Sequence, residues 1–300
     1  MHDLDEFTVT DAVIAQMADT PDERLREIMA AAVRHLHAFA RDVDLTPEEW
    51  LFGIGFMTEI GKTCTASRQE TILLSDVLGL SAMVNALHTK TSLEKATDAS
   101  LLGPFYRETA PHLPLGASIA SVPDSPELVF YGQIRDTAGA GIAGATVQVW
   151  QTDEHGFYDM QLHGQEKMDH RAVFTTDANG CFHFRTVRPL GYYIPMDGPV
   201  GQLIRAQNRH GCRPAHIHFL IGADLYRELV TSLYLGDDQY IDTDTVFGVS
   251  ASLIVSPGPD AHSPFPELDA IHYDFTLSLA GADGESRVGA DPAKLARAAE

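Results

Sequence analysis

Two histidines stand two residues apart in the segment RPAHIHF, residues 213–219. Side chains two apart on a β-strand project from the same face, so the imidazoles of His216 and His218 could reach one metal ion side by side. A pair of this kind also arises on any solvated strand. By itself the segment predicts half of a metal site, and the other donors must come from elsewhere in the chain.

Two tyrosine-bearing segments could supply those donors. In residues 150–159 (WQTDEHGFYD), a predicted strand runs into a turn that delivers Tyr158. Residues 188–199 (RPLGYYIPMDGP) form a loop whose prolines and glycines restrict where Tyr192 and Tyr193 lie. Taken alone, each tyrosine is an ordinary aromatic side chain whose hydroxyl is satisfied at a surface. The tyrosines indicate a metal site only in combination with the two histidines.

Together with residues 101–106 (LLGPFY), these segments resemble the intradiol ring-cleavage dioxygenases, which open catechol-type rings between the two hydroxyl-bearing carbons. The resemblance covers most of the chain. In the family's loop pattern the ligand tyrosine stands three residues before a proline, so Tyr192 rather than Tyr193 matches, ahead of Pro195. The resemblance implies one non-haem Fe(III) per subunit, with O2 as co-substrate and the ligands Tyr158, Tyr192, His216 and His218.

The ligand types agree with the chemistry of ferric iron. Fe(III) is a hard ion that phenolate oxygens stabilise, whereas two histidines and one carboxylate suit Fe(II) oxygenases. A free tyrosine has a pKa near ~10, but coordination to a trivalent cation is expected to deprotonate it.

The resemblance also makes Tyr192 a base for substrate protons. It places the Arg213 guanidinium over the substrate, where it stabilises negative charge; such an arginine is otherwise usually a surface charge.

Softer features resemble one subgroup of the family, the hydroxyquinol 1,2-dioxygenases, which cleave benzene-1,2,4-triol to 3-hydroxy-cis,cis-muconate or its tautomer maleylacetate. The segments that carry this likeness are RQE at 68–70, LLSDVLG at 73–79, GFYDMQ at 156–161 and DTDTVFGV at 242–249. Catechol, or chlorinated and methylated catechols cleaved to cis,cis-muconates, are the alternative substrates.

The same resemblance implies a substrate pocket lined by Leu73, Asp76, Leu101, Leu102, Gly103, Pro104, Phe105, Ile194, Pro195, Arg213 and Val246. A carboxylate at Asp76 could accept a hydrogen bond from the third hydroxyl, which catechol lacks. Asp76 could equally cap or pair within the helical region, because a buried carboxylate needs a partner either way. Ser232 stands where many relatives carry a longer polar side chain, and we expect it to reach iron-bound or axial groups only through water.

The elements around these residues predict an α+β protein, with a helical N-terminal domain in residues 1–97 and an antiparallel β-sandwich in residues 98–300. The resemblance implies that the first is the dimerisation domain and the second the catalytic domain. TPDE at 20–23 and TPEE at 46–49 predict capped helix starts, with threonine at the cap and proline first in the helix. Apolar residues recur at helical spacing from Leu25 to Phe39, and residues 69–88 contain another helical pattern.

Beyond residue 97, short β-branched or aromatic runs between glycines and prolines predict strands at 128–135, 145–151, 181–187, 216–221, 229–235 and 273–279. Sandwich and barrel are hard to separate by this pattern alone. The tail from residue 280 reads as a polar linker followed by a short helix.

Composition limits the partners. The chain has 42 acidic and 21 basic residues and a formal net charge of −21, so we expect neither nucleic-acid nor membrane-surface binding. No stretch approaches the ~18 apolar residues of a membrane span, and the acidic start is unlike a secretory signal, so we expect a cytoplasmic protein. Three cysteines without a CxxC are expected to be buried, reduced and structural.

Other interpretations remain open. The resemblance implies a homodimer through the N-terminal helices, with bound phospholipid, but these helices could pack only on their own sandwich. The second half could be a metal-free β-sandwich that serves as a binding module. A Zn or Fe(II) hydrolase using only His216 and His218 would lack a water-activating carboxylate beside them and would leave both tyrosines unexplained.

Overall fold

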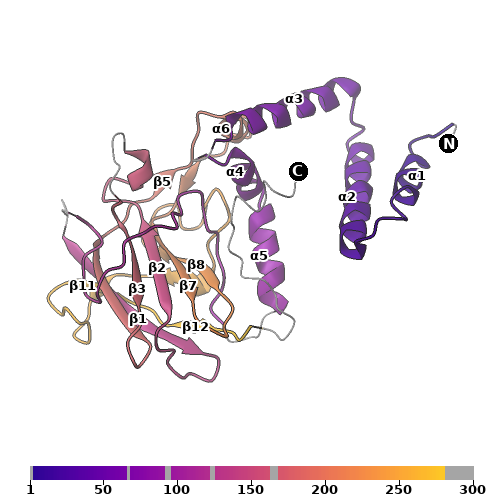
Figure 1. Ribbon diagram of the computed structural model, residues 1–300. Helices are drawn as coiled ribbons and strands as arrows, with labels where there is room; N and C mark the ends of the chain where they lie inside the picture. Colours follow the sequence, from indigo (N-terminus) through magenta and orange to yellow (C-terminus); the bar gives the residue numbers. More distant parts are fainter. Residues whose placement is uncertain (1–2, 66–67, 92–95, 122–125, 163–167, 281–300) are drawn as a thin grey trace. The chain divides into compact units, whose positions relative to one another are not determined.

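The computed structural model describes residues 3–65, 68–91, 96–121, 126–162 and 168–280 (Figure 1). The chain divides into two compact units, residues 1–62 and 63–300. The first unit holds α1 (Val9–Ala15), α2 (Glu23–Asp42) and nearly all of α3 (Pro47–Thr63). Helices α4 (Glu70–Val77) and α5 (Leu80–Thr91) belong to the second unit, and a domain boundary at residue 97 stays a prediction.

The two predicted helix starts have different outcomes. At α3 the capping box is confirmed, because Glu49 N donates to Thr46 Oγ1 at 3.2 Å and Thr46 N to Glu49 Oε2 at 3.0 Å. At α2 the prediction that Thr20 caps the helix is wrong. Asp22 is the N-cap, and its carboxylate accepts from Leu25 N at 3.0 Å. The helix is therefore capped by a carboxylate two residues after Thr20, and a carboxylate is a stronger acceptor than a hydroxyl.

Helix α2 carries an apolar face that the first unit, taken by itself, leaves largely uncovered. Ala30 is its one buried residue, whereas its exposed apolar side chains are Leu25, Ile28, Met29, Leu36 and Phe39. Helix α1 packs on α2, where Thr10 Oγ1 lies 3.0 Å from His37 Nδ1. An apolar stripe without a covering element favours a further partner for this helix.

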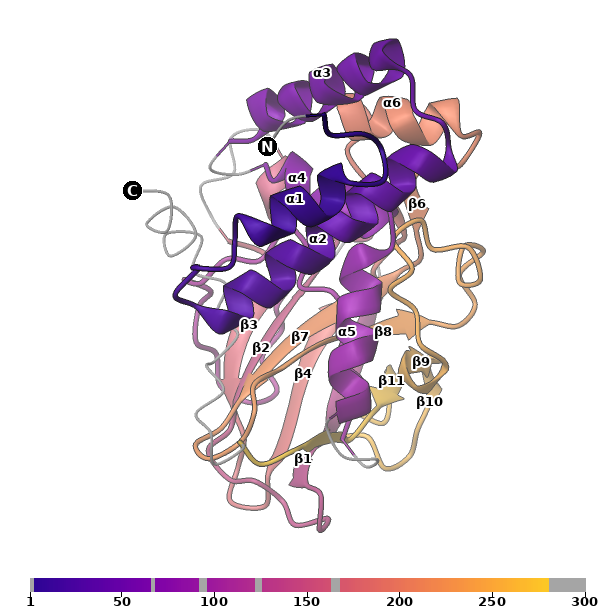
Figure 2. The same cartoon turned by 90° about the vertical axis from the view of Figure 1, so that its right-hand side faces the viewer.

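The helical pattern predicted over residues 69–88 is two helices rather than one. The chain turns at Leu78 and Gly79, and Gly79 has a φ of 73°, a left-handed conformation that ends α4. Helix α5 lies along the sandwich, where Asn85 Nδ2 donates to the Ser100 carbonyl at 3.1 Å (Figure 2). Helix α4 packs beside α6 (Pro199–Ala206), and buried Glu70 accepts from Val200 N at 3.1 Å.

Two five-stranded sheets form the sandwich, and a two-stranded ribbon pairs β5 with β6. One sheet has the order β10-β11-β1-β12, with β4 also paired to β1; the other has the order β3-β2-β7-β8-β9. The strand bounds are β1 (Glu127–Asp136), β2 (Thr146–Gln151), β3 (Arg171–Thr175), β4 (Cys181–Val187), β5 (Tyr192–Tyr193), β6 (Cys212–Arg213), β7 (His216–Gly222), β8 (Leu229–Leu235), β9 (Ile254–Val255), β10 (Gly258–Pro259), β11 (Asp269–His272) and β12 (Phe275–Leu277).

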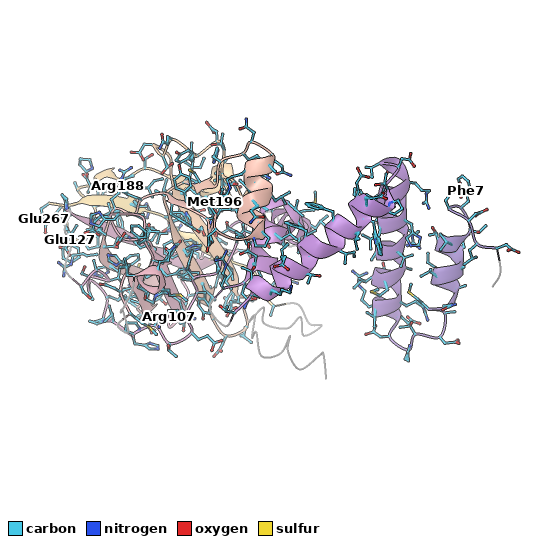
Figure 3. The ribbon with its side chains drawn as sticks, turned by 90° about the horizontal axis from the view of Figure 1, so that it is seen from above. Phe7, Arg107, Glu127, Arg188, Met196 and Glu267 are labelled. Atoms are coloured by element: carbon cyan, nitrogen blue, oxygen red, sulfur yellow. The ribbon has the colours of Figure 1, made fainter. Side chains whose placement is uncertain are left out.

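The sheets are mixed rather than purely antiparallel. Antiparallel pairs predominate, but β11 and β12 run parallel to β1, and β9 runs parallel to β8. These strands return after long connections, which allow the parallel pairing that a tight hairpin forbids. The register of β1 against β4 pairs Glu127 with Val187, and Figure 3 accordingly shows Glu127 and Arg188 at the same end of the sandwich.

Five of the predicted strands correspond to β1, β2, β4, β7 and β8, whereas residues 273–279 contain only the short β12. The sequence pattern missed β3, β11 and the two-residue strands β5, β6, β9 and β10. The two-residue strands are too short to show an alternation. Buried phenylalanines from both sheets fill the interior, and Phe130 lies 4.9 Å from Phe219 between ring centroids. The sandwich therefore has one continuous apolar core beneath the ends of β2, β7 and β8.

Three smaller expectations can be compared with the structure. The cysteines are free, but only Cys212 is buried, so the prediction of burial is wrong for Cys64 and Cys181, which are half-buried. No single described helix is long and apolar enough to cross a membrane; α4 and α5 pass that test only together, with a 72° bend between them. The helix predicted in the tail beyond residue 280 lies outside the described residues.

Candidate metal centre and substrate pocket

Strand β7 presents His216 and His218 on one face, and both imidazoles are buried. His216 Nδ1 lies 2.6 Å from the Pro214 carbonyl oxygen. A carbonyl only accepts, so Nδ1 carries the ring proton and the lone pair of His216 is on Nε2. The two Nε2 atoms lie 3.1 Å apart, and both therefore face the same small volume.

Sheet register places supporting side chains around His218. Trp150 of β2 and Ser232 of β8 are its direct neighbours across the sheet. The Trp150 ring stacks on the imidazole with 4.8 Å between centroids, and Ser232 Oγ lies 3.0 Å from His218 Nδ1. Ser232 thus contacts the imidazole directly, on the ring nitrogen turned away from the centre. The expectation that it reaches iron-bound or axial groups only through water stays a prediction.

Tyr158 follows β2 at the end of a closed loop. Asp153 holds this loop, because its Oδ1 accepts from His155 N at 2.9 Å and from Phe157 N at 2.8 Å. The Tyr158 side chain is fully buried, and the Phe105 ring stacks on it with 4.2 Å between centroids. The loop therefore delivers a fixed phenol oxygen rather than a mobile surface tyrosine.

Tyr192 lies on β5 directly opposite Arg213 on β6. A Cβ at the preceding Gly191 would lie 2.6 Å from the Arg213 carbonyl oxygen, so only glycine permits this approach of the two segments. Tyr192 is 7% exposed, whereas Tyr193 is 62% exposed. The structure therefore places the first tyrosine of the pair, and not the second, in the interior.

The four side chains converge although they come from three separate segments. Tyr158 Oη lies 3.0 Å from His218 Nε2 and 3.4 Å from His216 Nε2. The Tyr192 ring meets the Tyr158 ring edge-on at 5.3 Å between centroids and lies 5.8 Å from the His216 ring. Two nitrogen and two oxygen donors thus surround one position.

Burial controls the charge of this donor set. It lowers the pKa of His216 to about 3 and that of His218 well below its ordinary value, while it raises the pKa of Tyr158 and Tyr192. Both imidazoles are therefore neutral at pH 7, with lone pairs available. The phenols would lose their protons only to a strong Lewis acid.

These residues fit a hard, highly charged metal ion. Neutral imidazoles and phenolates form a donor set suited to ferric iron. Among the described residues, no group of three or more histidine, cysteine, aspartate and glutamate side chains could hold a metal, so a site made of two histidines and a carboxylate does not form here. The tyrosines are therefore needed to complete a coordination sphere around His216 and His218.

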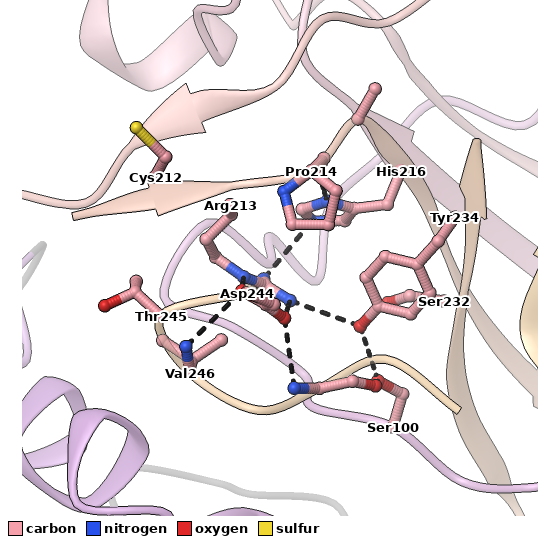
Figure 4. Close-up of polar contacts among 12 residues, drawn as sticks. Ser100, Cys212, Arg213, Pro214, His216, Ser232, Tyr234, Asp244, Thr245 and Val246 are labelled. Carbon is pink, nitrogen blue, oxygen red and sulfur yellow. Dashed lines mark hydrogen bonds and ion pairs between the residues drawn. The ribbon is translucent and has the colours of Figure 1, made fainter. Parts of the chain in front are cut away.

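Arg213 is buried beside this centre (Figure 4). Its Nη1 lies 3.3 Å from His216 Nε2, and Tyr192 is its direct neighbour across the β5–β6 ribbon. On the other side it forms a two-point ion pair with Asp244, at 3.1 and 3.2 Å, and donates to Tyr234 Oη at 3.2 Å. Neither Asp244 nor Tyr234 was predicted as a site residue from the sequence, although Asp244 lies within the segment 242–249 that carries the likeness to hydroxyquinol dioxygenases.

A cavity adjoins the four converging side chains. It is lined by Tyr192 and by Leu73, Asp76, Leu101, Gly103, Pro104, Phe105, Ile194, Pro195, Arg213 and Val246. Leu102 alone among the residues assigned to the pocket is absent from this lining. Asp76 lines the cavity, so it faces the pocket. Burial raises the pKa of Asp76, against the opposing effects of Ser81 and the Arg213 charge.

Comparison with known proteins identifies the family. The profile described as "Dioxygenase" matches residues 102–281, and that described as "Catechol dioxygenase N terminus" matches residues 22–96. The chain is 46% identical over 254 residues to the 6-chlorohydroxyquinol 1,2-dioxygenase of Cupriavidus pinatubonensis, covering 85% of this chain and 92% of the relative. It is 45% identical over 246 residues to the hydroxyquinol 1,2-dioxygenase of a Rhizobium species, covering 81% and 83%.

A solved structure agrees with these relatives. The hydroxyquinol 1,2-dioxygenase of Pseudomonas putida DLL-E4 superposes with a TM-score of 0.84 at 39% identity, covering 92% of this chain and 99% of that one. Both halves of the chain, the helical start and the sandwich, are therefore matched by sequence and by fold. The chain belongs to the intradiol ring-cleavage dioxygenase family.

Proposed function

We propose that this enzyme cleaves hydroxyquinol, benzene-1,2,4-triol, with O2 to give 3-hydroxy-cis,cis-muconate or its tautomer maleylacetate. Both atoms of O2 enter the product and no atom leaves, so the product is the triol with two added oxygen atoms. The convergence of Tyr158, Tyr192, His216 and His218 beside a small cavity carries the proposal of ring cleavage. The similarity to hydroxyquinol dioxygenases supports the choice of substrate.

Members of this family use non-haem iron, and we propose one Fe(III) per subunit held by the four converging side chains. Bound ferric iron would supply Lewis acidity toward the phenols and the diol, together with the electronic coupling that allows the ring to react with O2. The His216 Nδ1 bond to Pro214 and the His218 contact with Ser232 orient both imidazoles for this role.

The chain's own residues divide the remaining tasks. Tyr192, on the cavity side of the centre, accepts a proton from a substrate hydroxyl at its phenol oxygen. Arg213 keeps its guanidinium over the cavity and stabilises negative charge as it develops on the ring. Apolar walls exclude water from the reacting face; they are formed by Leu73, Leu101, Phe105, Ile194 and Val246.

Asp76 is the residue that we propose to distinguish a triol from a diol. It is a carboxylate in an otherwise mostly apolar lining, and it can accept a hydrogen bond from the third hydroxyl. Catechol and its chlorinated or methylated forms are the second candidate substrates. The mostly apolar lining would contact a plain ring as well as a hydroxylated one, so it also suits these diols.

Further proposals concern the whole protein. We propose a cytoplasmic homodimer that forms through the N-terminal helices and binds phospholipid there, with residues 1–97 as the dimerisation domain. The exposed apolar face of α2 supports the dimer, since five large apolar side chains are left uncovered by the first unit. The excess of acidic over basic residues argues against nucleic acid as a partner.

Oxygen uptake measured side by side tests the substrate. Purified protein reconstituted with iron is given hydroxyquinol, catechol, and chlorinated and methylated catechols, and kcat/KM is compared. We expect hydroxyquinol to be preferred; a higher value for any catechol would transfer the assignment to that diol.

A second measurement separates the enzyme from a metal-free binding module. Tyrosinate bound to Fe(III) absorbs visible light by charge transfer, so the reconstituted protein is expected to be coloured. Full iron occupancy without a visible band would contradict the proposed ligands, and no iron uptake would favour the binding module.

A further inference from the structure

Arg213 lies in a position that a guanidinium would not keep without help. It is 3% exposed, and its Nη1 lies 3.3 Å from Nε2 of His216, which we propose as a ligand of a trivalent cation. Charges of the same sign repel strongly in a buried environment, and a buried charge needs a partner. Some group must therefore hold the guanidinium beside the centre.

Asp244 has the geometry for this task. Its two carboxylate oxygens accept from Arg213 Nε at 3.1 Å and Nη2 at 3.2 Å, leaving Nη1 directed toward His216 (Figure 4). Both side chains of the pair are 3% exposed. A two-point pair of this kind fixes the plane of the guanidinium as well as its position.

The same carboxylate also shapes the pocket wall. Asp244 Oδ1 accepts from Val246 N at 3.3 Å, and Oδ2 accepts from Gly248 N at 3.0 Å. Val246 lines the cavity. One side chain thus connects the guanidinium to the backbone that places an apolar wall residue.

A third set of bonds closes the network on its far side. Tyr234 Oη accepts from Arg213 and lies 2.9 Å from Ser100 Oγ, which also donates to the Gly248 carbonyl at 3.1 Å. Ser100 directly precedes Leu101 of the cavity lining. A Cβ at Gly248 would lie 2.7 Å from Tyr234 Oη and 3.0 Å from Arg213 Nη2, so this position has no room for a methyl group.

We propose that Asp244 is a positioning residue for ring cleavage: it neutralises Arg213, fixes the guanidinium toward the centre and the cavity, and ties it to the Val246 wall. This inference rests on the proposed function. It assigns to Asp244 an action through Arg213 and not through contact with substrate. Removal of its charge should therefore affect turnover and catecholate binding, while the metal ligands remain in place.

The test compares Asp244→Asn with wild type in the iron-reconstituted enzyme. Three properties are measured. They are the iron content together with the visible charge-transfer band, the anaerobic binding of 4-nitrocatechol as a catechol analogue, and kcat and KM for the preferred substrate. We expect iron content and band to be retained, kcat to fall about 10- to 100-fold, and 4-nitrocatechol to bind several-fold more weakly, because a misplaced catalytic group costs about that much.

Two further variants keep the test decisive if Asp244→Asn does not fold. Asp244→Glu keeps the charge and is expected to recover part of the loss in kcat. Gly248→Ala directs a methyl group at Tyr234, Arg213 and Asp244 without removing a charge, and it is expected to lower both kcat and 4-nitrocatechol affinity at unchanged iron content.

Two controls separate positioning from general destabilisation. Asp242→Asn removes an exposed carboxylate two residues away and is expected to behave as wild type. Phe182→Leu weakens the sandwich core and is expected to lower the thermal midpoint while kcat stays constant. A fall in kcat for Phe182→Leu equal to that of Asp244→Asn would contradict the positioning role.

The proposal is overturned if Asp244→Asn keeps kcat and 4-nitrocatechol affinity within about twofold of wild type, or if Asp244→Glu is no better than Asp244→Asn. It is also overturned if activity falls only in proportion to iron content. These outcomes differ from failure of the proposed function, in which the wild-type protein itself cleaves no catechol and binds no 4-nitrocatechol.

Discussion

At the scale of single residues, the centre is defined by polar side chains that burial forces into particular protonation states. Neutral imidazoles and protonated phenols are the stable forms of His216, His218, Tyr158 and Tyr192 in this interior. A metal cation reverses that preference for the phenols only. These protonation states support the proposal that the phenol oxygens act as bases once a cation is bound.

Substitution of Tyr192 tests its double role. Tyr192→Phe is expected to retain part of its iron but to lower kcat about 10²- to 10⁴-fold, because a ligand and a base are lost together. Oxygen uptake and iron content measure the two effects. Tyr193→Phe is the matched control and should keep activity, since that ring is 62% exposed. Unchanged turnover in Tyr192→Phe would reassign the role to its neighbour.

We propose that Asp76 governs the choice between triol and diol. A hydrogen bond to a charged acceptor contributes about 1.5–3 kcal/mol, which corresponds to about 10- to 150-fold in kcat/KM. Asp76→Ala should therefore lower kcat/KM for hydroxyquinol by about this factor more than for catechol. Oxygen uptake with both substrates on one preparation measures the ratio. Equal losses would show that Asp76 does not contact the third hydroxyl.

At the scale of elements, the pocket depends on how α4 is fastened beside the sandwich. Helix α4 carries Leu73 and Asp76 into the cavity, while its first residue, Glu70, is fully buried. The Glu70 carboxylate accepts from Arg68 Nε at 3.0 Å and from Val200 N at the start of α6. This single carboxylate therefore fixes the helix that forms one wall of the pocket.

Loss of the Glu70 carboxylate should weaken the attachment of α4, which forms one wall of the pocket. Glu70→Gln places an amide group against the Arg68 donors and is expected to destabilise the fold by about 1–3 kcal/mol, with a raised KM for hydroxyquinol. Urea unfolding measures the stability.

Glu59→Gln is the matched control for this variant. It removes an exposed ion pair with Lys62, with N and O 2.8 Å apart, and should change stability by less than about 1 kcal/mol. Equal stability of Glu70→Gln and Glu59→Gln would contradict the proposed anchor.

At the scale of the whole molecule, a large negative charge coexists with an uncovered apolar helix face. The charge of −21 keeps separate molecules apart, so association needs a specific apolar surface. Leu36 and Phe39 of α2 are 65% and 55% exposed. Burial of one such side chain contributes about 1.5–3 kcal/mol, enough for a few of them to hold two chains together.

The double variant Leu36→Glu and Phe39→Glu should convert the proposed dimer into a monomer, because two carboxylates would have to be buried at the interface. Sedimentation velocity at micromolar concentration measures the change. Leu225→Glu is the control, since Leu225 is 80% exposed in the second unit and should leave the assembly unchanged. A wild-type protein that sediments as a monomer would refute the dimer.

The sequence by itself determined those features that depend on neighbouring residues. The HxH spacing on β7, the Thr46 capping box and the five longest strands are local patterns, because alternation and capping need only residues a few positions apart. The choice of Tyr192 over Tyr193 came from family resemblance, and the difference in their exposure agrees with it.

Only the tertiary structure decided the features that join distant segments. Asp244 became the partner of Arg213, Ser232 the partner of His218, and β11 a parallel neighbour of β1, because sheet register and long connections bring them together. A sequence specifies which donors exist, but packing in three dimensions selects the partner of each.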